Sequence, residues 1–161
     1  MNIRSFIKKD WASVSRIYAK GLATGIATFE TEVPSFEVWN SKFINSCRLV
    51  AEIDNEVVAF AVLSQVSKRE VYKGVAEVTV YVDDKNQGKG IGYLLLTELV
   101  KCSEKNGFWT LQAGVFSQNI ASIKLHEKCG FRVVGVRERI GKRNGKWYDN
   151  HFLERRSRSI I

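Results

Sequence analysis

The chain of 161 residues has a single proline, Pro34, and no low-complexity tract. It also lacks an internal repeat with a period of about 20 to 50 residues, which would mark a solenoid or a propeller. These absences exclude a repeat array and leave no linker at which two domains would join. We therefore expect one domain over residues 1–161, long enough to bury a hydrophobic core of its own.

Long apolar runs and paired cysteines are missing as well. The N-terminal segment has no continuous apolar stretch of the kind found in signal peptides or membrane spans. Cys47, Cys102 and Cys129 are odd in number and show no paired metal-ligand spacing. We expect reduced, mostly buried thiols in a cytoplasmic protein with no metal site and no membrane partner. A catalytic cysteine is the sharper alternative.

The charge is strongly positive, with a formal net charge of +8 and many basic residues between positions 137 and 158. Such a field attracts nucleic acid, anionic membranes and polyphosphate cofactors alike. A basic nucleic-acid-binding module is one interpretation, because Phe108, Trp109 and Trp147 stand near basic residues. No RNA-binding aromatic signature or helix-turn-helix pattern accompanies them, so no nucleic-acid partner is expected.

Apolar periodicity and turn residues predict a mixed α/β (α+β) fold, with a largely antiparallel twisted sheet flanked by helices. The helices are expected after Asp10, after Ser35, from about Tyr93 and at 120–128. The pair Asn144-Gly145 is a strong hairpin signal. Strands are expected at 3–6, 49–53, 57–63, 75–82, 108–116, 131–140 and 147–153.

A glycine-rich turn joins the strand at 75–82 to the helix near Tyr93, with the sequence Gln-Gly-Lys-Gly-Ile-Gly at 87–92. The first turn of a helix has N–H groups without intrahelical partners, and glycine lets an anion approach them. The spacing fits neither the dinucleotide fingerprint nor the P-loop pattern. The turn predicts a ligand that carries a pyrophosphate, and a turn that only joins two elements is the alternative.

This turn resembles the acetyl-CoA signature of the GNAT-type N-acetyltransferases. The resemblance to the phosphinothricin acetyltransferase-like branch of that superfamily covers nearly the whole chain, and it rests on five segments in the right order. These segments are 28–34, 76–82, 87–92, 119–131 and 137–147. The resemblance implies a GNAT-like domain that uses acetyl-CoA, releases CoA and forms a homodimer.

The resemblance also implies the residues of the site. The cofactor-binding positions are Val80, Tyr81, Val82, Gln87, Gly88, Lys89, Gly90, Ile91, Gly92, Tyr93, Asn119 and Ser122. The substrate-binding positions are Phe29, Arg69, Tyr72, Glu77 and Thr79. Related sequences often carry a second basic residue where this chain has Ser67, so recognition of a carboxylate or phosphinate is expected to differ. Arg69 either grips an acidic group or is an ordinary surface charge.

Two residues are predicted to be catalytic, Glu77 and His126. Strand alternation puts Glu77 and Thr79 on one face, where a carboxylate can take the proton of an acceptor ammonium. A solvent-facing glutamate is the alternative. His126 stands where many GNAT enzymes have a tyrosine proposed to protonate the departing thiolate, and histidine exchanges protons near neutrality. A structural histidine on a short helix is the alternative.

The leading hypothesis is acetyl-CoA-dependent N-acetylation of the α-amine of a small amino acid-like substrate. Phosphinothricin, methionine sulfoximine and methionine sulfone are the compounds that the resemblance suggests. Another amine, such as an antibiotic, a polyamine or a protein N-terminus, is the alternative within the enzyme class.

Overall fold

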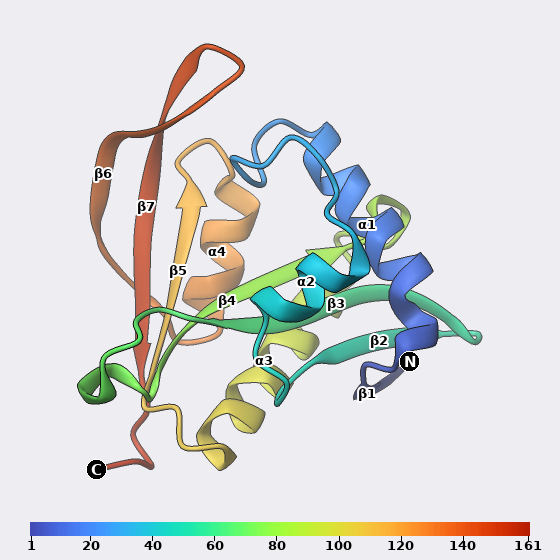
Figure 1. The fold of residues 1–161 in the computed structure, drawn as a ribbon, viewed down its shortest axis with the longest axis horizontal. Coiled ribbons are helices and arrows are strands. Elements are labelled where there is room, and N and C mark those ends of the chain that lie inside the picture. Colours follow the sequence, from blue (N-terminus) through green and yellow to red (C-terminus); the bar gives the residue numbers. More distant parts are fainter.

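The computed structural model describes residues 1–161 and contains one seven-stranded sheet in the order β1-β2-β3-β4-β5-β7-β6 (Figure 1). The predicted element order and the mixed α/β class are confirmed. Only β4 and β5 pair in parallel, so the prediction of a largely antiparallel sheet is also confirmed. The strands are β1 (Asn2–Ser5), β2 (Leu49–Ile53), β3 (Glu56–Gln65), β4 (Val75–Val82), β5 (Thr110–Phe116), β6 (Arg132–Arg143) and β7 (Lys146–Arg156).

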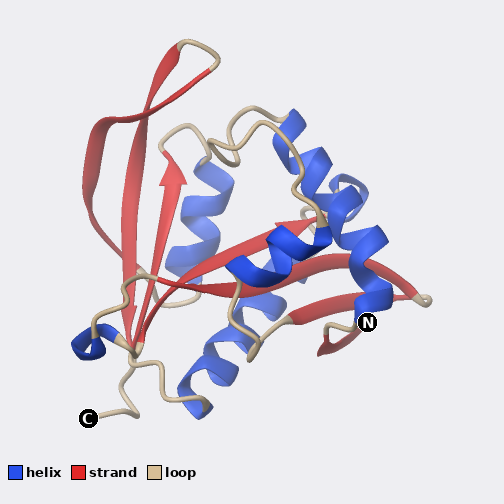
Figure 2. Cartoon of the chain, in the orientation of Figure 1, coloured by secondary structure: helices blue, strands red, loops and turns tan.

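Helices cover both faces of the sheet (Figure 2). They are α1 (Trp11–Ala23), α2 (Phe36–Lys42), α3 (Ile91–Lys105) and α4 (Ile120–Lys128), with 3-10 turns η1 (Lys8–Asp10), η2 (Glu70–Tyr72) and η3 (Asp84–Asn86). One buried cluster joins α1 and α2 to the sheet and includes Ile17, Trp39 and Phe60. A larger cluster lies under α3 and contains Leu95 and Leu99. None of the helices is long and apolar enough to cross a membrane.

Local signals explain most element boundaries. The Ser35 hydroxyl accepts a hydrogen bond from the Val38 N–H and so caps α2 as predicted. Asn144 and Gly145 both have positive φ, which the tight turn between β6 and β7 requires. Helix α3 begins at Ile91, two residues before the predicted start, because Gly90 adopts the left-handed conformation directly before it.

The sheet opens between β4 and β5. The two strands pair only where Val75–Glu77 faces Thr110–Gln112. Beyond that point β4 stays paired with β3 up to Val82, whereas β5 stays paired with β7 up to Phe116. Figure 1 shows the two strands pointing in different directions from their common start. The result is a wedge between the two strands, within an otherwise continuous sheet.

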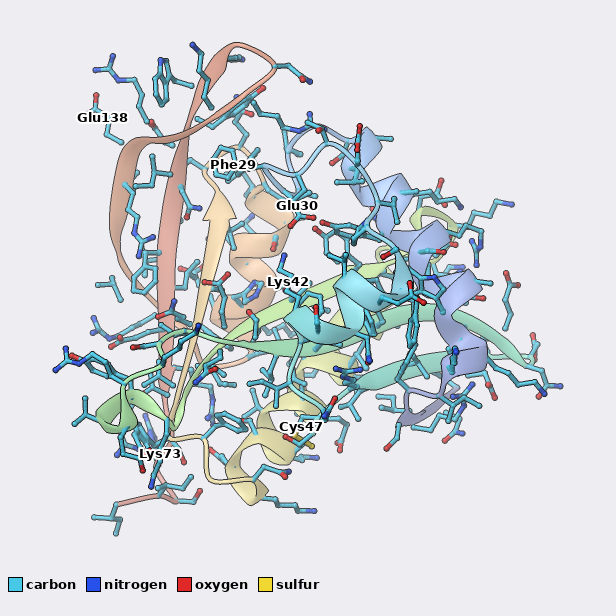
Figure 3. All side chains as sticks on the ribbon, in the orientation of Figure 1. Phe29, Glu30, Lys42, Cys47, Lys73 and Glu138 are labelled. Carbon is cyan, nitrogen blue, oxygen red and sulfur yellow. A yellow bond between two sulfur atoms is a disulfide. The ribbon has the colours of Figure 1, made fainter.

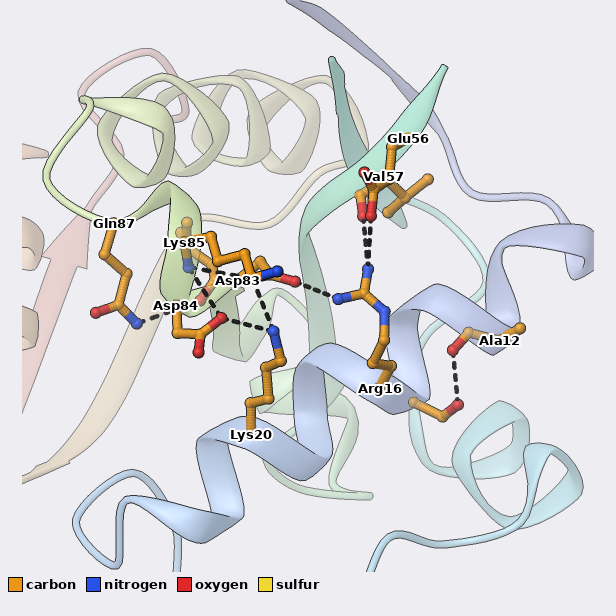
Figure 4. A network of polar contacts seen from close by, with 11 residues as sticks. Ala12, Arg16, Lys20, Glu56, Val57, Asp83, Asp84, Lys85 and Gln87 are labelled. Atoms are coloured by element: carbon orange, nitrogen blue, oxygen red, sulfur yellow. Dashed lines mark hydrogen bonds and ion pairs between the residues drawn. The ribbon is translucent and has the colours of Figure 1, made fainter. Parts of the chain in front are cut away.

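Asp83 anchors the end of β4 to helix α1 (Figure 4). Its buried carboxylate accepts hydrogen bonds from Arg16 and, at 3.1 Å, from the Lys20 ammonium. Burial raises the pKa of Asp83, but hydrogen bonds from neighbours that include Lys20 and Arg16 outweigh this and hold that pKa well below its ordinary value. Asp83 is therefore ionised at neutral pH and fixes the start of the segment that leads to the glycine turn.

One expectation from the sequence is wrong. Cys47 and Cys102 form a disulfide with a Cα–Cα distance of 5.7 Å, and only Cys129 is a free thiol. The pairing escaped prediction because 55 residues separate the two cysteines, and only the packing of α3 against the segment before β2 brings them together. The disulfide ties the C-terminal part of α3 to the loop directly before β2.

We predict that a reductant lowers the Tm by about 5 to 15 °C, because a cross-link of this kind typically contributes about 2 to 4 kcal/mol by restricting the unfolded chain. The measurement is thermal unfolding with and without reductant. The double variant Cys47→Ala/Cys102→Ala should be insensitive to reductant, whereas Cys129→Ala should respond like the wild type. A wild-type Tm that ignores the reductant would contradict the prediction.

Candidate active site

The wedge exposes one edge of β4. The Asp83 N–H donates to the Val58 carbonyl on β3. Because backbone groups alternate in direction along a strand, the N–H groups of Val80 and Val82 point to the opposite edge. No strand pairs with that edge beyond Glu77. An extended ligand in the wedge can therefore form strand-like hydrogen bonds with Val80 and Val82.

The two faces of β4 contact different parts of the protein. Val80 and Val82 pack toward the core cluster under α3. Tyr81 packs toward α1, where its ring meets Tyr18 edge-on at 5.2 Å. Glu77 and Thr79 share the Tyr81 face by alternation, as the sequence predicted. The strand thus presents a carboxylate and a hydroxyl to the side of the sheet that α1 and α2 cover.

The glycine turn adjoins the free edge of β4 and leads into α3. Gly88 and Gly90 have φ values of +74° and +78°, and a Cβ at either would meet nothing within 4 Å. The first N–H groups of α3, from Ile91 onward, have no intrahelical partner and can bind an anion. Gly92 has a different role, because a Cβ there would lie 3.2 Å from Leu125 and 3.4 Å from Val82. Gly92 lets α3 pack closely against α4 and β4.

Three side chains of the predicted cofactor site lie around this turn. The Gln87 amide donates to the Val82 carbonyl at 3.3 Å, which ties the turn to the end of β4. The Lys89 ammonium is exposed and donates to Asn86 at 3.3 Å. Tyr93, in the first turn of α3, lies under the Lys128 ammonium at 4.7 Å from the ring centre. A cationic group and free N–H groups therefore surround the same turn.

Helix α4 begins beside the wedge, directly after β5. The Asn119 side chain accepts a hydrogen bond from the Ser122 N–H at 3.2 Å, so Asn119 is the N-cap of α4. This contact fixes the orientation of the Asn119 amide. The amide nitrogen stays free to donate to a ligand.

His126 is buried on α4 with 3% of its surface exposed. Its Nδ1 lies 2.7 Å from the Ser122 carbonyl, and its ring meets Phe131 edge-on at 5.2 Å. A carbonyl only accepts hydrogen bonds, so Nδ1 carries a proton. Burial lowers the pKa of His126, although the bond to Ser122 partly opposes this shift. The ring is therefore neutral at pH 7, which favours the structural interpretation of this histidine.

Glu77 lies where β4 and β5 begin to part. Its Oε2 accepts a hydrogen bond from the Gln112 amide on β5 at 3.2 Å, and the protein donates no other hydrogen bond to this carboxylate. Glu77 is half-buried, and it is the last β4 residue that pairs with β5. One carboxylate oxygen is thus held by the protein and the other is free to accept a proton.

A cavity of about 410 Å³ lies between β4 and the segment that joins α1 to α2. Phe29 and Thr79, two of the predicted substrate-binding residues, line it. Glu77 is about 7 Å further along β4 from Thr79, on the same face but outside the lining. The remaining lining residues are Tyr18, Glu30, Thr31, Glu32, Pro34, Val38, Trp39, Lys42, Phe43 and Phe60.

Arg69 and Tyr72 do not line this cavity. They belong to the exposed segment around η2, where the Arg69 guanidinium stacks over the Tyr72 ring at 5.2 Å. Figure 3 shows Lys73, which follows η2, well away from Phe29, Glu30 and Lys42. The structure therefore brings together only part of the predicted substrate site.

Three charged residues line the cavity, Glu30, Glu32 and Lys42, and none of them was predicted as a site residue. Glu30 and Glu32 lie in the segment 28–34 on which the resemblance rests, so the sequence contains a signal for their position near the site. Lys42 had no such signal, because it ends an amphipathic helix and resembles any solvent-facing lysine in the sequence.

Known proteins share this architecture. The family model described as an acetyltransferase (GNAT) domain matches residues 3–152. The phosphinothricin N-acetyltransferase of Streptomyces viridochromogenes is 30% identical, over 96% of this chain and 87% of its own length. The L-methionine sulfoximine/L-methionine sulfone acetyltransferase of Salmonella typhimurium is 28% identical, over 96% of this chain and 93% of its own length.

A solved structure gives the same picture. The chain is similar to a GNAT superfamily phosphinothricin acetyltransferase from Sinorhizobium meliloti in complex with acetyl-CoA. The TM-score is 0.88 at 29% identity, and the match covers 96% of this chain and 87% of that one.

The burial of His126 predicts a pH-dependent stability. Because the unfolded chain, with an ordinary pKa near about 6.5, binds the proton more readily than the folded protein, the stabilising contribution is complete above that pH and is lost as the pH falls below it. The free energy of unfolding should therefore fall more steeply in the wild type than in His126→Gln as the pH is lowered from about 7.5 to about 5, a range that brackets the ordinary pKa of histidine. Denaturant titrations at several pH values measure this. Equal slopes would contradict the prediction.

Proposed function

This chain belongs to the GNAT acetyltransferase family, and on that premise we propose that it acetylates the α-amine of a small amino acid-like acceptor. GNAT enzymes transfer the acetyl group of acetyl-CoA, and acetyl-CoA is the cofactor of this enzyme. The proposed acceptors are phosphinothricin, methionine sulfoximine and methionine sulfone, for which two relatives are named. The observation that carries the proposal is the continuity of three features: the free edge of β4, the glycine turn at its end, and the cavity beside Thr79.

We propose that acetyl-CoA lies along the wedge. The backbone of Val80, Tyr81 and Val82 faces its pantetheine arm, and the free N–H groups of Val80 and Val82 support this assignment. Its pyrophosphate is bound at the turn, where the open space at Gly88 and Gly90 fits a phosphate group. Asn119 contacts the cofactor near its reactive end. The further cofactor residues are Gln87, Lys89, Ile91, Gly92, Tyr93 and Ser122.

The chemistry of the site follows from the two sides of β4. When bound, acetyl-CoA supplies an acetyl group as a thioester. Glu77 accepts the proton of the acceptor ammonium, directly or through water, because a protonated amine has no lone pair with which to attack. The free oxygen of its carboxylate and its position at the opening of the wedge support this role. Phe29 and Thr79 orient the acceptor from the cavity wall.

Other predicted roles have weaker support. Protonation of the departing thiolate by His126 stays a prediction, because burial keeps this residue neutral. Substrate binding by Arg69 and Tyr72 also stays a prediction, since neither lines the cavity.

We further propose that residues 1–161 form one acetyltransferase domain that acts as a homodimer in the cytoplasm. Exposed apolar side chains on β6 and β7, among them Val136, Ile140 and Trp147, support an interface between two copies. The Cys47–Cys102 disulfide is unusual for the cytoplasm, so thiol titration of the protein from fresh cell lysate tests the location.

The proposed acceptor class is tested by a screen of amines with acetyl-CoA, in which release of the free thiol is followed. We expect methionine sulfone, methionine sulfoximine or phosphinothricin to give the highest kcat/KM. A higher kcat/KM with a polyamine, an antibiotic or a peptide N-terminus would show that the acceptor belongs to that class and not to the amino acids.

We predict that acetyl-CoA or CoA raises the Tm, because a ligand that binds only the folded state stabilises it. Gly90→Ala should remove most of this shift, since it places a methyl group in the space assigned to the pyrophosphate. Gly145→Ala is the matched control, because Gly145 has a φ of +79° in the distant β6–β7 turn and suffers the same backbone strain. Equal CoA-induced shifts in the two variants would remove the turn from the cofactor site.

Replacing the proposed base, Glu77, should slow turnover without weakening the binding of acetyl-CoA. Glu77→Gln keeps the size of the side chain, and we expect turnover to fall by roughly 10²- to 10⁴-fold while acetyl-CoA affinity stays near the wild-type value. Glu70→Gln, on the exposed η2, serves as the control and should be unaffected. Near-normal turnover in Glu77→Gln between about pH 6 and 9, which brackets the pKa values of His and an α-amine, would assign proton removal to water or another group.

A further inference from the structure

The charges in the cavity wall are unevenly distributed. Lys42 is the one cationic side chain among the lining residues, and the acids Glu30 and Glu32 lie near it. Aromatic rings, including Phe29 and Trp39, form much of the remaining wall. A low-polarity wall strengthens any interaction with the few charges that it contains.

Glu30 is held by two partners that occupy both of its carboxylate oxygens. The buried Tyr18 hydroxyl donates to Oε2 at 2.5 Å, and the Lys42 ammonium donates to Oε1 at 2.7 Å. Burial raises the pKa of Glu30, but the hydrogen bonds from Lys42 and Tyr18 outweigh this and lower the pKa. Glu30 is therefore an ionised carboxylate that is already fully engaged, and its effect is to fix the position of Lys42.

The Lys42 ammonium, in contrast, still has N–H donors that no protein group accepts from. An ammonium carries three N–H donors, and the protein accepts a hydrogen bond from only one of them, at Glu30. The ammonium also lies 5.3 Å from the centre of the Phe43 ring, at the edge of the cavity. About half of the Lys42 side chain is exposed, so its two free donors are accessible to a ligand.

We propose that Lys42 binds the carboxylate of an α-amino acid acceptor and thereby makes the enzyme selective for amino acids over simple amines. Lys42 on α2 and Thr79 on β4 line the same cavity. Because the α-amine and the carboxylate are attached to the same carbon, an acceptor held at Lys42 has its amine inside this cavity, and Glu77, outside the lining, takes its proton through water. Glu32, the other carboxylate of the lining, attracts the ammonium of the same zwitterion. This inference rests on the proposed function and assigns to Lys42 the contact that the sequence suggested for Arg69.

The test compares L-methionine sulfone with its decarboxylated analogue, 3-(methylsulfonyl)propylamine, as acceptors. In Lys42→Gln, we expect kcat/KM for methionine sulfone to fall by roughly 10- to 100-fold, mostly through KM, as for the loss of a charge-assisted hydrogen bond. The analogue has no carboxylate, so its kcat/KM should change by less than about threefold, within the scatter of ordinary surface substitutions. Lys42→Arg should restore most of the preference because it keeps the charge.

Arg69→Gln tests the competing assignment, because the resemblance implies substrate binding by Arg69 whereas the structure places Arg69 outside the cavity. The inference is overturned if Arg69→Gln, and not Lys42→Gln, removes the preference for methionine sulfone, or if Lys42→Gln slows both acceptors equally. Calorimetric binding of methionine sulfone in the presence of CoA gives a second readout. If the wild type binds methionine sulfone more tightly than Lys42→Gln does but acetylates no amino acid, the proposed function fails, whereas binding of the carboxylate by Lys42 stands.

Discussion

The early separation of β4 from β5 is the constraint on which the rest of the site depends. After only three paired residues on each strand, β4 follows β3 and β5 follows β7, so the backbone of β4 from Val78 onward has one unpaired edge. Buried polar backbone groups need partners, and a strand edge inside a sheet is a ready place for an extended ligand. Asp83 holds the end of that strand on α1, and Gly90, at the end of the loop that follows, directly precedes α3. This opening lies between the features of the proposed site: the glycine turn at 87–92, the proposed base Glu77 and the cavity beside Thr79.

Much of the fold could be predicted because it is specified locally. The alternation at 75–82, the Ser35 cap and the Asn144-Gly145 turn each depend on residues close in sequence, and all three appear in the structure. Contacts between distant segments could not be predicted in this way. The Cys47–Cys102 disulfide and the separation of β4 from β5 are both outcomes of tertiary packing.

The candidate site also contains residues that the sequence predicts and residues whose position depends on tertiary packing. The glycine turn could be predicted because anion binding at the start of a helix needs glycine at defined positions. The different roles of its glycines could not, since only the tertiary packing shows that Gly92 accommodates Leu125 while the space at Gly88 and Gly90 is open. Phe29 and Thr79 lie in the cavity wall, whereas Arg69 and Tyr72 lie on an exposed turn. Lys42 and Glu30 meet across 12 residues of chain, and a charge pair formed between a loop and the end of a short helix leaves no periodic signal.

Amide hydrogen exchange along β4, measured by NMR with and without saturating CoA, shows directly whether the cofactor pairs with the open edge of this strand. The N–H groups of Val80 and Val82 face the wedge, whereas those of Thr79 and Tyr81 face β3. We predict that CoA slows exchange at Val80 and Val82 and leaves the already protected Thr79 and Tyr81 nearly unchanged. Unchanged exchange at Val80 and Val82 in the CoA-bound protein would show that the cofactor does not complete the open edge of β4.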